Sequence, residues 1–114
     1  MVEIDKIDQR MIVNNLEPFE PTHPGEIIKD EIEFRKITQK SLAAKMRVNY
    51  TIVNDVINGK RSVNIKFAIL CEAAIGIPAN MLINMQRDYD MYAAKHDKSF
   101  MSLLEKVKHI AAVL

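Results

Sequence analysis

Several features that would indicate particular classes of protein are scarce or absent in this sequence. Cys71 is the one cysteine among 114 residues, so the chain can form neither an intramolecular disulfide nor a cysteine-rich zinc cluster. No apolar run approaches the roughly 20 residues of a membrane-spanning helix. The opening residues, MVEIDKIDQR, are charged and lack the apolar segment of a secretory signal. We therefore expect a cytoplasmic protein that has no membrane partner.

Glycine is also scarce, at the three separate positions Gly25, Gly59 and Gly76. Isolated glycines cannot form a phosphate-binding loop, and no alternating strand pattern flanks a hairpin dipeptide. Hydrophobic residues make up 48% of the chain and charged residues 27%, which is enough apolar material for one core. The sequence therefore predicts an all-α protein with a compact domain of five to six helices.

Charge is distributed very unevenly along the chain, although the net charge is only +1. Residues 1–34 carry nine acidic and three basic side chains, whereas residues 35–61 carry seven basic side chains and one acidic one. Because local fields rather than total charge attract polyanions, the basic block favours nucleic acid as a partner.

Apolar periodicity and residues typical of helix ends predict six helices. Pro24 suits the first position of a helix, and Thr38 and Asn49 are typical N-cap residues. Gly59 and Gly76 are placed to end helices in the left-handed conformation. The predicted ranges are 24–34, 39–46, 50–58, 64–75, 78–94 and 100–114, with one short helical turn at 8–15.

The apolar faces of the fourth and the last predicted helix indicate which side of each helix is buried. The fourth helix is expected to bury Phe67, Leu70, Cys71 and Ala74. The last helix has a wide apolar stripe, which needs burial either against the fourth and fifth helices or against a second subunit. The stripe consists of Phe100, Leu103, Leu104, Val107, Ile110, Ala111 and Leu114. We expect an N-terminal arm (1–20), a DNA-binding domain (21–95) and a C-terminal amphipathic helix that forms a dimerisation element (96–114).

Residues 39–46 and 50–58 have the length and spacing of a helix-turn-helix, in which the second helix enters the major groove. Small Ala43 permits close helix approach, Val48 fills the turn, and Val53 holds the second helix to the core. Gln39 and the sequence Asn58-Gly59-Lys60-Arg61 complete the pattern.

With these residues the sequence resembles the Cro/repressor-like (XRE) helix-turn-helix family, and within it the HigA-type (VapI-like) addiction-module antidotes, over about residues 18–95. Other matching segments are His23-Pro24-Gly25-Glu26, Thr38-Gln39 and the stretch from Ile83-Asn84-Met85-Gln86 to Tyr89-Asp90. The resemblance implies a lambda-repressor-like fold. The chain departs from the family pattern at Arg47, where glycine is usual, and at Leu82, where tryptophan is usual.

The resemblance also implies which side chains contact DNA. Base edges would be read by Tyr50, Thr51, Asn54 and Asp55, since asparagine can bond adenine and a threonine methyl can contact thymine. Phosphates would be held by Gln39, Lys40, Asn49, Lys60 and Arg61. The alternative is that these are ordinary polar residues on a solvated helix face.

No catalytic, cofactor or metal site is expected. Cys71 falls on an apolar helix face, as buried cysteines do. His23, His96 and His109 have no metal-ligand spacing, and acidic residues such as Glu26 lie at the spacing of an exposed helix face.

The sequence thus favours a DNA-binding repressor that acts as a homodimer on operator DNA. The resemblance adds neutralisation of a cognate toxin, a ribonuclease, and repression of the shared operon. Residues 1–34, with their negative charge, would then face the toxin or merely keep the N-terminus soluble. Two other functions stay open: a regulator without a toxin, and a protein-interaction module that has lost DNA binding, which the negative charge of Asp55 would suit.

Overall fold

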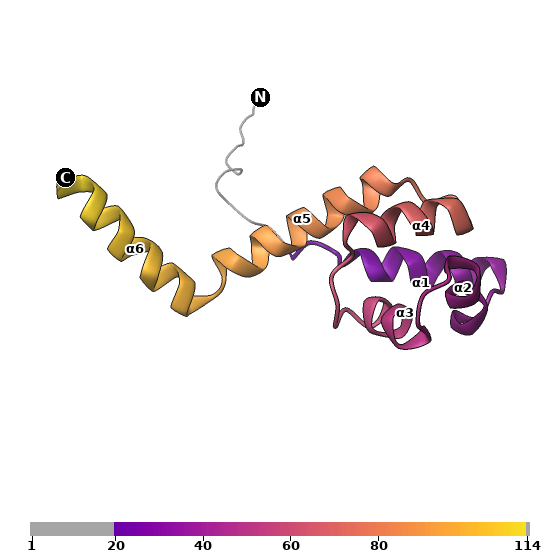
Figure 1. The fold of residues 1–114 in the computed structure, drawn as a ribbon. Helices are drawn as coiled ribbons and strands as arrows, with labels where there is room; N and C mark the ends of the chain where they lie inside the picture. Colours follow the sequence, from indigo (N-terminus) through magenta and orange to yellow (C-terminus); the bar gives the residue numbers. More distant parts are fainter. Residues whose placement is uncertain (1–19, 114) are drawn as a thin grey trace, which may run out of the picture.

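The computed structural model describes residues 20–113, so the turn expected at 8–15 and the stripe residue Leu114 lie outside the described part. Within it the chain forms six α-helices (Figure 1). They are α1 (Pro24–Arg35), α2 (Gln39–Met46), α3 (Tyr50–Ile57), α4 (Ile65–Ile75), α5 (Ala79–Lys95) and α6 (Lys98–Val113). The predicted all-α fold is confirmed, and no described helix has the length and apolar character that crossing a membrane requires.

The predicted helix ends are confirmed at the proline, the N-cap and the two glycines that the sequence indicated. Pro24 occupies the first turn of α1, and the hydroxyl of Thr38 accepts a hydrogen bond from the Ser41 N–H at 3.0 Å. Gly59 and Gly76 have φ of +74° and +78°, the left-handed conformation that glycine adopts without strain. These ends set the angles at which successive helices pack.

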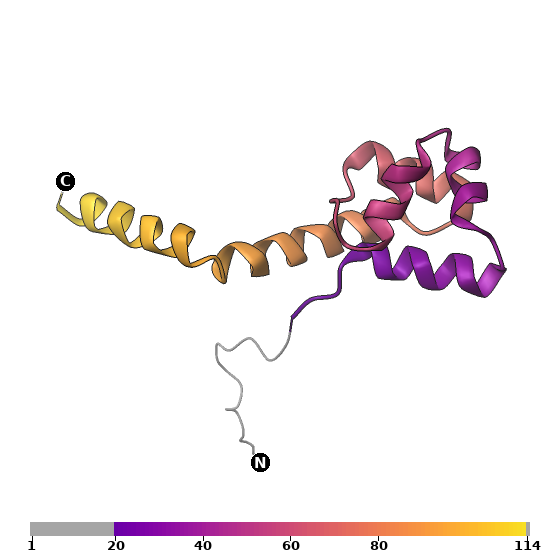
Figure 2. The same ribbon diagram turned by 90° about the horizontal axis from the view of Figure 1, so that it is seen from below.

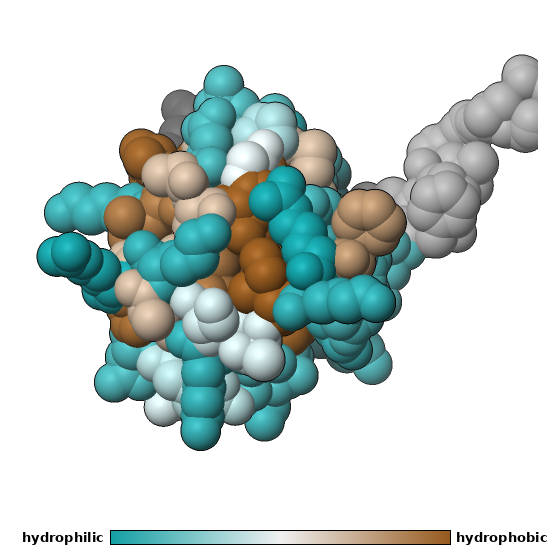
Figure 3. All heavy atoms as spheres, turned by 90° about the vertical axis from the view of Figure 1, so that its right-hand side faces the viewer, coloured by the Kyte–Doolittle hydropathy of each residue, from teal (hydrophilic) through white to brown (hydrophobic). Residues whose placement is uncertain are grey.

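The core lies between α1, α2, α3, α4 and the first half of α5. Its largest fully buried side chains include Ile28, Leu42, Met46, Val53 and Leu82. Leu82 therefore fills the position where the family pattern has tryptophan. Seen from the end opposite α6, the body shows apolar atoms at the centre of a face bordered by polar ones (Figure 3).

Gly25 marks a close approach between two helices of the core. A Cβ atom built on Gly25 would lie 1.9 Å from the carbonyl oxygen of Val56, a distance that no methyl group can occupy. The first turn of α1 can therefore pack against the end of α3 only because residue 25 has no side chain.

The predicted burial of one residue of α4, Leu70, is wrong. Leu70 is 38% exposed, whereas Ala68 and Ile75 are buried together with Phe67 and Cys71. The buried face centres on Ala68, Cys71 and Ile75, at i, i+3 and i+7, and Leu70 lies roughly 130° around the helix from that centre. The packing of α4 between α2 and α5 sets this orientation.

α6 does not pack on the body, so burial of its stripe against α4 and α5 of the same chain is wrong. None of its residues from 98 to 113 is buried, and both views show it directed away from the other helices (Figures 1 and 2). The hydrogen bonds of the two-residue connection after α5 hold α6 in this direction. His96 closes α5 through its backbone N–H, and Asp97 caps α6 by accepting from the Phe100 N–H at 3.0 Å.

Candidate nucleic-acid interface

The turn between α2 and α3 consists of residues 47–49. Arg47 adopts φ +57° and ψ +42°, the left-handed conformation that a glycine would take at this position. Its N–H bonds the Ala44 carbonyl, and the Val48 N–H bonds the Ala43 carbonyl at 3.1 Å. The turn keeps its geometry despite the arginine, at a cost on the order of 1 kcal/mol.

Asn49 begins α3 as the predicted N-cap. Its side-chain oxygen accepts from the Thr51 N–H at 2.8 Å. The side-chain NH₂ group of Asn49 remains a donor beside the positive end of the helix, where phosphate oxygens bind well. Thr51 itself is exposed in the first turn of α3.

A chain of amide hydrogen bonds connects α2 to the outer face of α3. Asn54 donates from Nδ2 to Gln39 Oε1 at 2.9 Å, and Asn58 donates from Nδ2 to Asn54 Oδ1 at 3.3 Å. A primary amide has two N–H groups and two lone pairs, so Asn54 keeps one donor and one acceptor. This is the pair of groups that bonds the major-groove edge of adenine.

The other exposed side chain at the start of α3 also contacts α2. The ammonium group of Lys40 lies 6.0 Å from the centroid of the Tyr50 ring, at the limit of a cation–π contact. Tyr50 is 43% exposed, so its ring is accessible beside a positive charge.

The negative charge on α3 has a nearby cation. Arg61 Nη2 lies 3.7 Å from a carboxylate oxygen of Asp55, and both side chains are partly exposed. At this exposure the pair adds little stability. It does, however, reduce the field that Asp55 directs toward a phosphate backbone.

The basic loop after α3 starts with a fixed helix end. The Gly59 N–H bonds the Val56 carbonyl at 3.0 Å, and the Lys60 N–H bonds the Asp55 carbonyl at 2.8 Å. These two bonds form a Schellman motif. It determines the direction in which Lys60 and Arg61 leave the helix.

Gln86 of α5 holds the far side of the same loop. Its Oε1 accepts from the Val63 N–H at 2.8 Å, and its Nε2 donates to Asp90 at 2.9 Å and to Ser62 Oγ at 3.4 Å. Gln86 is buried, so removing it would leave the Val63 N–H without a partner in the core.

The side chain of His23 supports α3 and the basic loop after it from the side of the core. It is buried, its Nδ1 accepts from the Gly25 N–H at 2.9 Å, and its ring meets Tyr89 edge-on with centroids 4.9 Å apart. Burial lowers the pKa of His23, and the nearby charge of Asp90 and a hydrogen bond to the Arg61 backbone only partly oppose this effect. The neutral ring is therefore the form that the fold favours.

The structure brings most of the predicted site residues into contact in pairs: Gln39 with Asn54, Lys40 with Tyr50, and Asp55 with Arg61. Asn49 lies in the turn between the two helices, Thr51 lies on α3, and Lys60 lies in the loop that follows. Sequence reasoning missed the supporting residues His23, Asn58, Gln86 and Asp90. Each of them lies in a segment that carried the family resemblance, and that resemblance was the one signal in the sequence that could have indicated their role.

Other reactive side chains play no part in this surface. Cys71 is fully buried, as expected, and burial raises the pKa of its thiol to about 11. Within residues 20–113, no three His, Cys, Asp or Glu side chains gather as metal ligands would.

Comparison with known proteins identifies this arrangement. The profile of the helix-turn-helix family matches residues 28–82. A protein from Pseudomonas aeruginosa, solved in complex with its operator DNA, is 30% identical to this chain, with a TM-score of 0.62 over 67% of this chain and 83% of that one. The chain belongs to the XRE-type helix-turn-helix family.

Two further relatives of this helix-turn-helix protein agree with the resemblance to HigA-type antidotes. An addiction module antidote protein of the HigA family from Coxiella burnetii is 27% identical, with a TM-score of 0.60 over 84% of this chain and 97% of that one. Virulence-associated protein I of Dichelobacter nodosus is 26% identical over 83 residues, which are 72% of this chain and 77% of the relative. The family and fold are those of DNA-binding regulators rather than enzymes.

Proposed function

We propose that this helix-turn-helix protein is a sequence-specific repressor that binds operator DNA upstream of its own gene. The amide chain from Gln39 through Asn54 is the observation that carries the proposal. It holds a base-reading group in place before DNA arrives, so little side-chain entropy is lost on binding.

In the proposed complex α3 lies in the major groove. Asn54 bonds an adenine edge, Thr51 contacts a thymine methyl group, and Tyr50 and Asp55 contact neighbouring bases, with Asp55 accepting from a cytosine amino group. Gln39 uses its Oε1 to hold Asn54, which leaves its NH₂ group for a phosphate.

Phosphates on either side of the groove are held by Gln39, Lys40, Asn49, Lys60 and Arg61. These contacts set the register of α3 without distinguishing bases. All five carry exposed or half-exposed side chains. A homodimer places two such surfaces on half-sites about 34 Å apart, and α6 is the proposed dimerisation element.

We further propose that the protein is the antitoxin of a toxin–antitoxin module and neutralises a ribonuclease toxin encoded in the same operon. The outer side of α1 supports this role, because it combines carboxylates with a side chain suited to anchoring a partner. Phe34 is 85% exposed next to Glu33, and Glu26 and Asp30 lie on the same helix. A ribonuclease that grips RNA presents positive charge, which this side would attract.

Fluorescence anisotropy with upstream and scrambled duplexes over a salt series tests the repressor. We expect the upstream duplex to bind about 10³-fold more tightly, with a steep dependence on salt. Equal affinity for both duplexes would contradict the proposal.

A pull-down with the product of the neighbouring toxin gene tests the second role. Phe34→Ala should weaken capture, because the aromatic side chain would be a hot spot of the interface. Ile69→Ala, which also truncates an exposed apolar side chain but on α4, is the matched control. Equal capture by both variants would exclude Phe34, and loss of capture only after removal of residues 1–20 would assign the contact to the arm.

A further inference from the structure

Within residues 20–113, two extended apolar surfaces face solvent. The first is the stripe of α6, where Phe100, Leu103, Val107 and Ile110 are between 44% and 55% exposed. Side chains of this size in a regular stripe are normally covered in a soluble helix.

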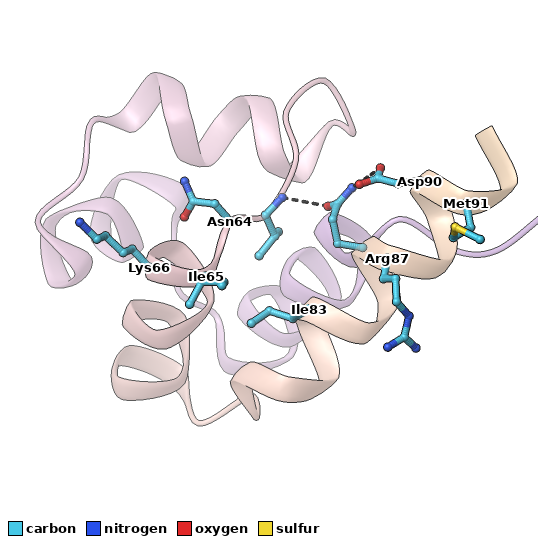
Figure 4. Close-up of a pocket in the computed structure, with 9 residues that line it drawn as sticks. Asn64, Ile65, Lys66, Ile83, Arg87, Asp90 and Met91 are labelled. Atoms are coloured by element: carbon cyan, nitrogen blue, oxygen red, sulfur yellow. Dashed lines mark hydrogen bonds between the residues drawn. The ribbon is translucent and has the colours of Figure 1, made fainter. Parts of the chain in front are cut away.

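The second apolar surface is a groove between the start of α4 and the middle of α5, with a volume of about 740 Å³. Ile65 and Ile83 form its floor from the two sides, with Arg87 and Met91 further along α5 (Figure 4). Ile65 is 62% and Met91 is 55% exposed, so the groove has the chemistry of a helix-binding site.

The stripe of α6 is not directed into the groove of its own chain. The connection between α5 and α6 is limited to His96 and Asp97, and both are engaged at the helix ends. The His96 N–H bonds the Tyr92 carbonyl at 3.1 Å, its ring stacks on Tyr92, and Asp97 caps α6. Turning α6 back onto α5 would break this set of contacts.

We infer that α6 of each subunit docks into the α4–α5 groove of a second copy, running antiparallel to the partner's α5. The inference rests on the homodimer proposed above and names the surfaces that form it. Two-fold symmetry then makes the exchange reciprocal, so one interface covers both stripes and both grooves.

Charged side chains in and beside the groove match this arrangement, since Asp90 lines the groove and Asp88, which pairs with Arg87, lies next to it. Successive residues of a helix turn by about 100°, so Lys106 and Lys108 lie on opposite sides of the α6 stripe. By the same geometry, Asp88 and Asp90 lie on opposite sides of Arg87 on α5. Antiparallel packing puts Lys108 on the side of Asp88 and Lys106 on the side of Asp90.

One position of the two-fold axis also brings these pairs to the same height along the two helices. With the axis beside Lys98, each residue of one subunit faces the residue of the other subunit that is equally far from position 98 along the chain. Lys108 then faces Asp88, and Lys106 faces Asp90. The apolar positions from Leu104 to Val113 then lie over residues 83–92, which include the α5 side of the groove.

An exchange of charge tests this interface in the full-length protein. Asp88→Lys and Lys108→Asp alter exposed side chains, with 59% and 63% of their surfaces accessible, so neither disturbs the core. Each variant alone has two like-charged pairs in its homodimer, whereas a heterodimer of the two variants has two opposite pairs. Ser102→Lys, which adds a charge on the exposed α6 face opposite the stripe, is the control for charge alone.

Sedimentation velocity at micromolar concentration gives the readout. We expect each single variant to dimerise about tenfold more weakly than the wild type, the equimolar mixture to recover wild-type affinity, and Ser102→Lys to change nothing. Homodimers of Asp88→Lys that are as tight as the wild type, a mixture that stays monomeric, or a monomeric wild type would each overturn the inference.

Operator binding by the same samples separates this result from the proposed repressor function. If the mixture recovers dimerisation but no sample prefers the upstream duplex, the interface stands and the repressor fails. If the single variants remain dimeric and bind the operator, the repressor stands and its subunits meet elsewhere.

Discussion

The outer face of α2 and α3 and the stripe of α6 both face solvent, but their chemistry differs. On α2 and α3, amide side chains are bonded to one another and basic side chains surround them. On α6 the exposed side chains are aliphatic or aromatic in a regular stripe. The first surface suits a polar, negatively charged partner, and the second suits another apolar helix.

The two surfaces also differ in how they are supported. Beneath α3 lie Gly25 and His23, and Gln86 holds the loop that follows it, so the polar face is rigidly placed on the core. α6 meets the body through a two-residue connection and buries no side chain between residues 98 and 113. Substitutions under α3 should therefore affect folding, whereas substitutions on α6 should affect only association.

The largest effect is expected for Gly25→Ala. The added methyl group would collide with the Val56 carbonyl and force α1 away from α3, at a cost of about 3 kcal/mol in the free energy of unfolding. Urea denaturation measures it. Gly76→Ala, whose Cβ would be 3.7 Å from Arg35, is the control and should cost about 1 kcal/mol for its positive φ. Equal losses for both variants would contradict the close packing of α1 on α3.

Val107→Asp should leave the body folded but weaken dimerisation by about 100-fold, because a carboxylate would enter an apolar interface. Circular dichroism and sedimentation measure the two properties. Ala112→Asp introduces the same charge on the polar side of α6 and should leave dimerisation unchanged. A loss of helical content in Val107→Asp would mean that α6 supports the body after all.

Asn54→Ala should weaken binding to the upstream duplex by about 30-fold, since a bidentate base contact is worth about 2 kcal/mol. Binding to the scrambled duplex should be unchanged, which anisotropy detects. Asn80→Ala, at the exposed start of α5, is the matched control. If Asn54→Ala weakened both duplexes equally, Asn54 would be a phosphate contact.

Lys60→Ala should weaken binding to both duplexes by the same factor and reduce the salt slope by about one. Lys29→Ala removes a charge from α1 and should leave the slope unchanged. A selective effect of Lys60→Ala on the upstream duplex would assign base reading to the loop.

The smallest effect concerns pH. Burial lowers the pKa of His23 in the folded state, so below about pH 6.5 the unfolded chain binds more protons and the free energy of unfolding falls. Urea midpoints between about pH 8 and pH 5 measure this loss. His23→Asn, which keeps a capping side chain, should flatten the dependence, whereas His109→Gln on α6 should not. A dependence that His23→Asn leaves unchanged would assign it to other groups.

Local patterns in the sequence predict much of the structure. Thr38, Asn49 and Gly76 act over a few residues, so the helix ends that they specify follow directly from sequence. The exposure of Leu70 could not be predicted in this way, because the rotation of α4 depends on α2 and α5. The position of α6 was equally inaccessible, since its stripe predicts burial but not which surface covers it.

The site divides in the same way. The residues of the helix-turn-helix follow from its spacing, and the pairs that they form in space follow from the packing of α2 on α3. The role of Gln86 could not be predicted, because the Val63 N–H that it bonds is 23 residues away. A long-range contact of this kind leaves no periodic signal in one sequence.

Hydrogen-exchange mass spectrometry of the full-length protein, with and without the upstream duplex, tests the central claim most directly. We predict that DNA increases protection in residues 39–61 and leaves α6 unchanged. Protection confined to α6, or no protection in α2 and α3, would contradict the assignment of the polar face to DNA.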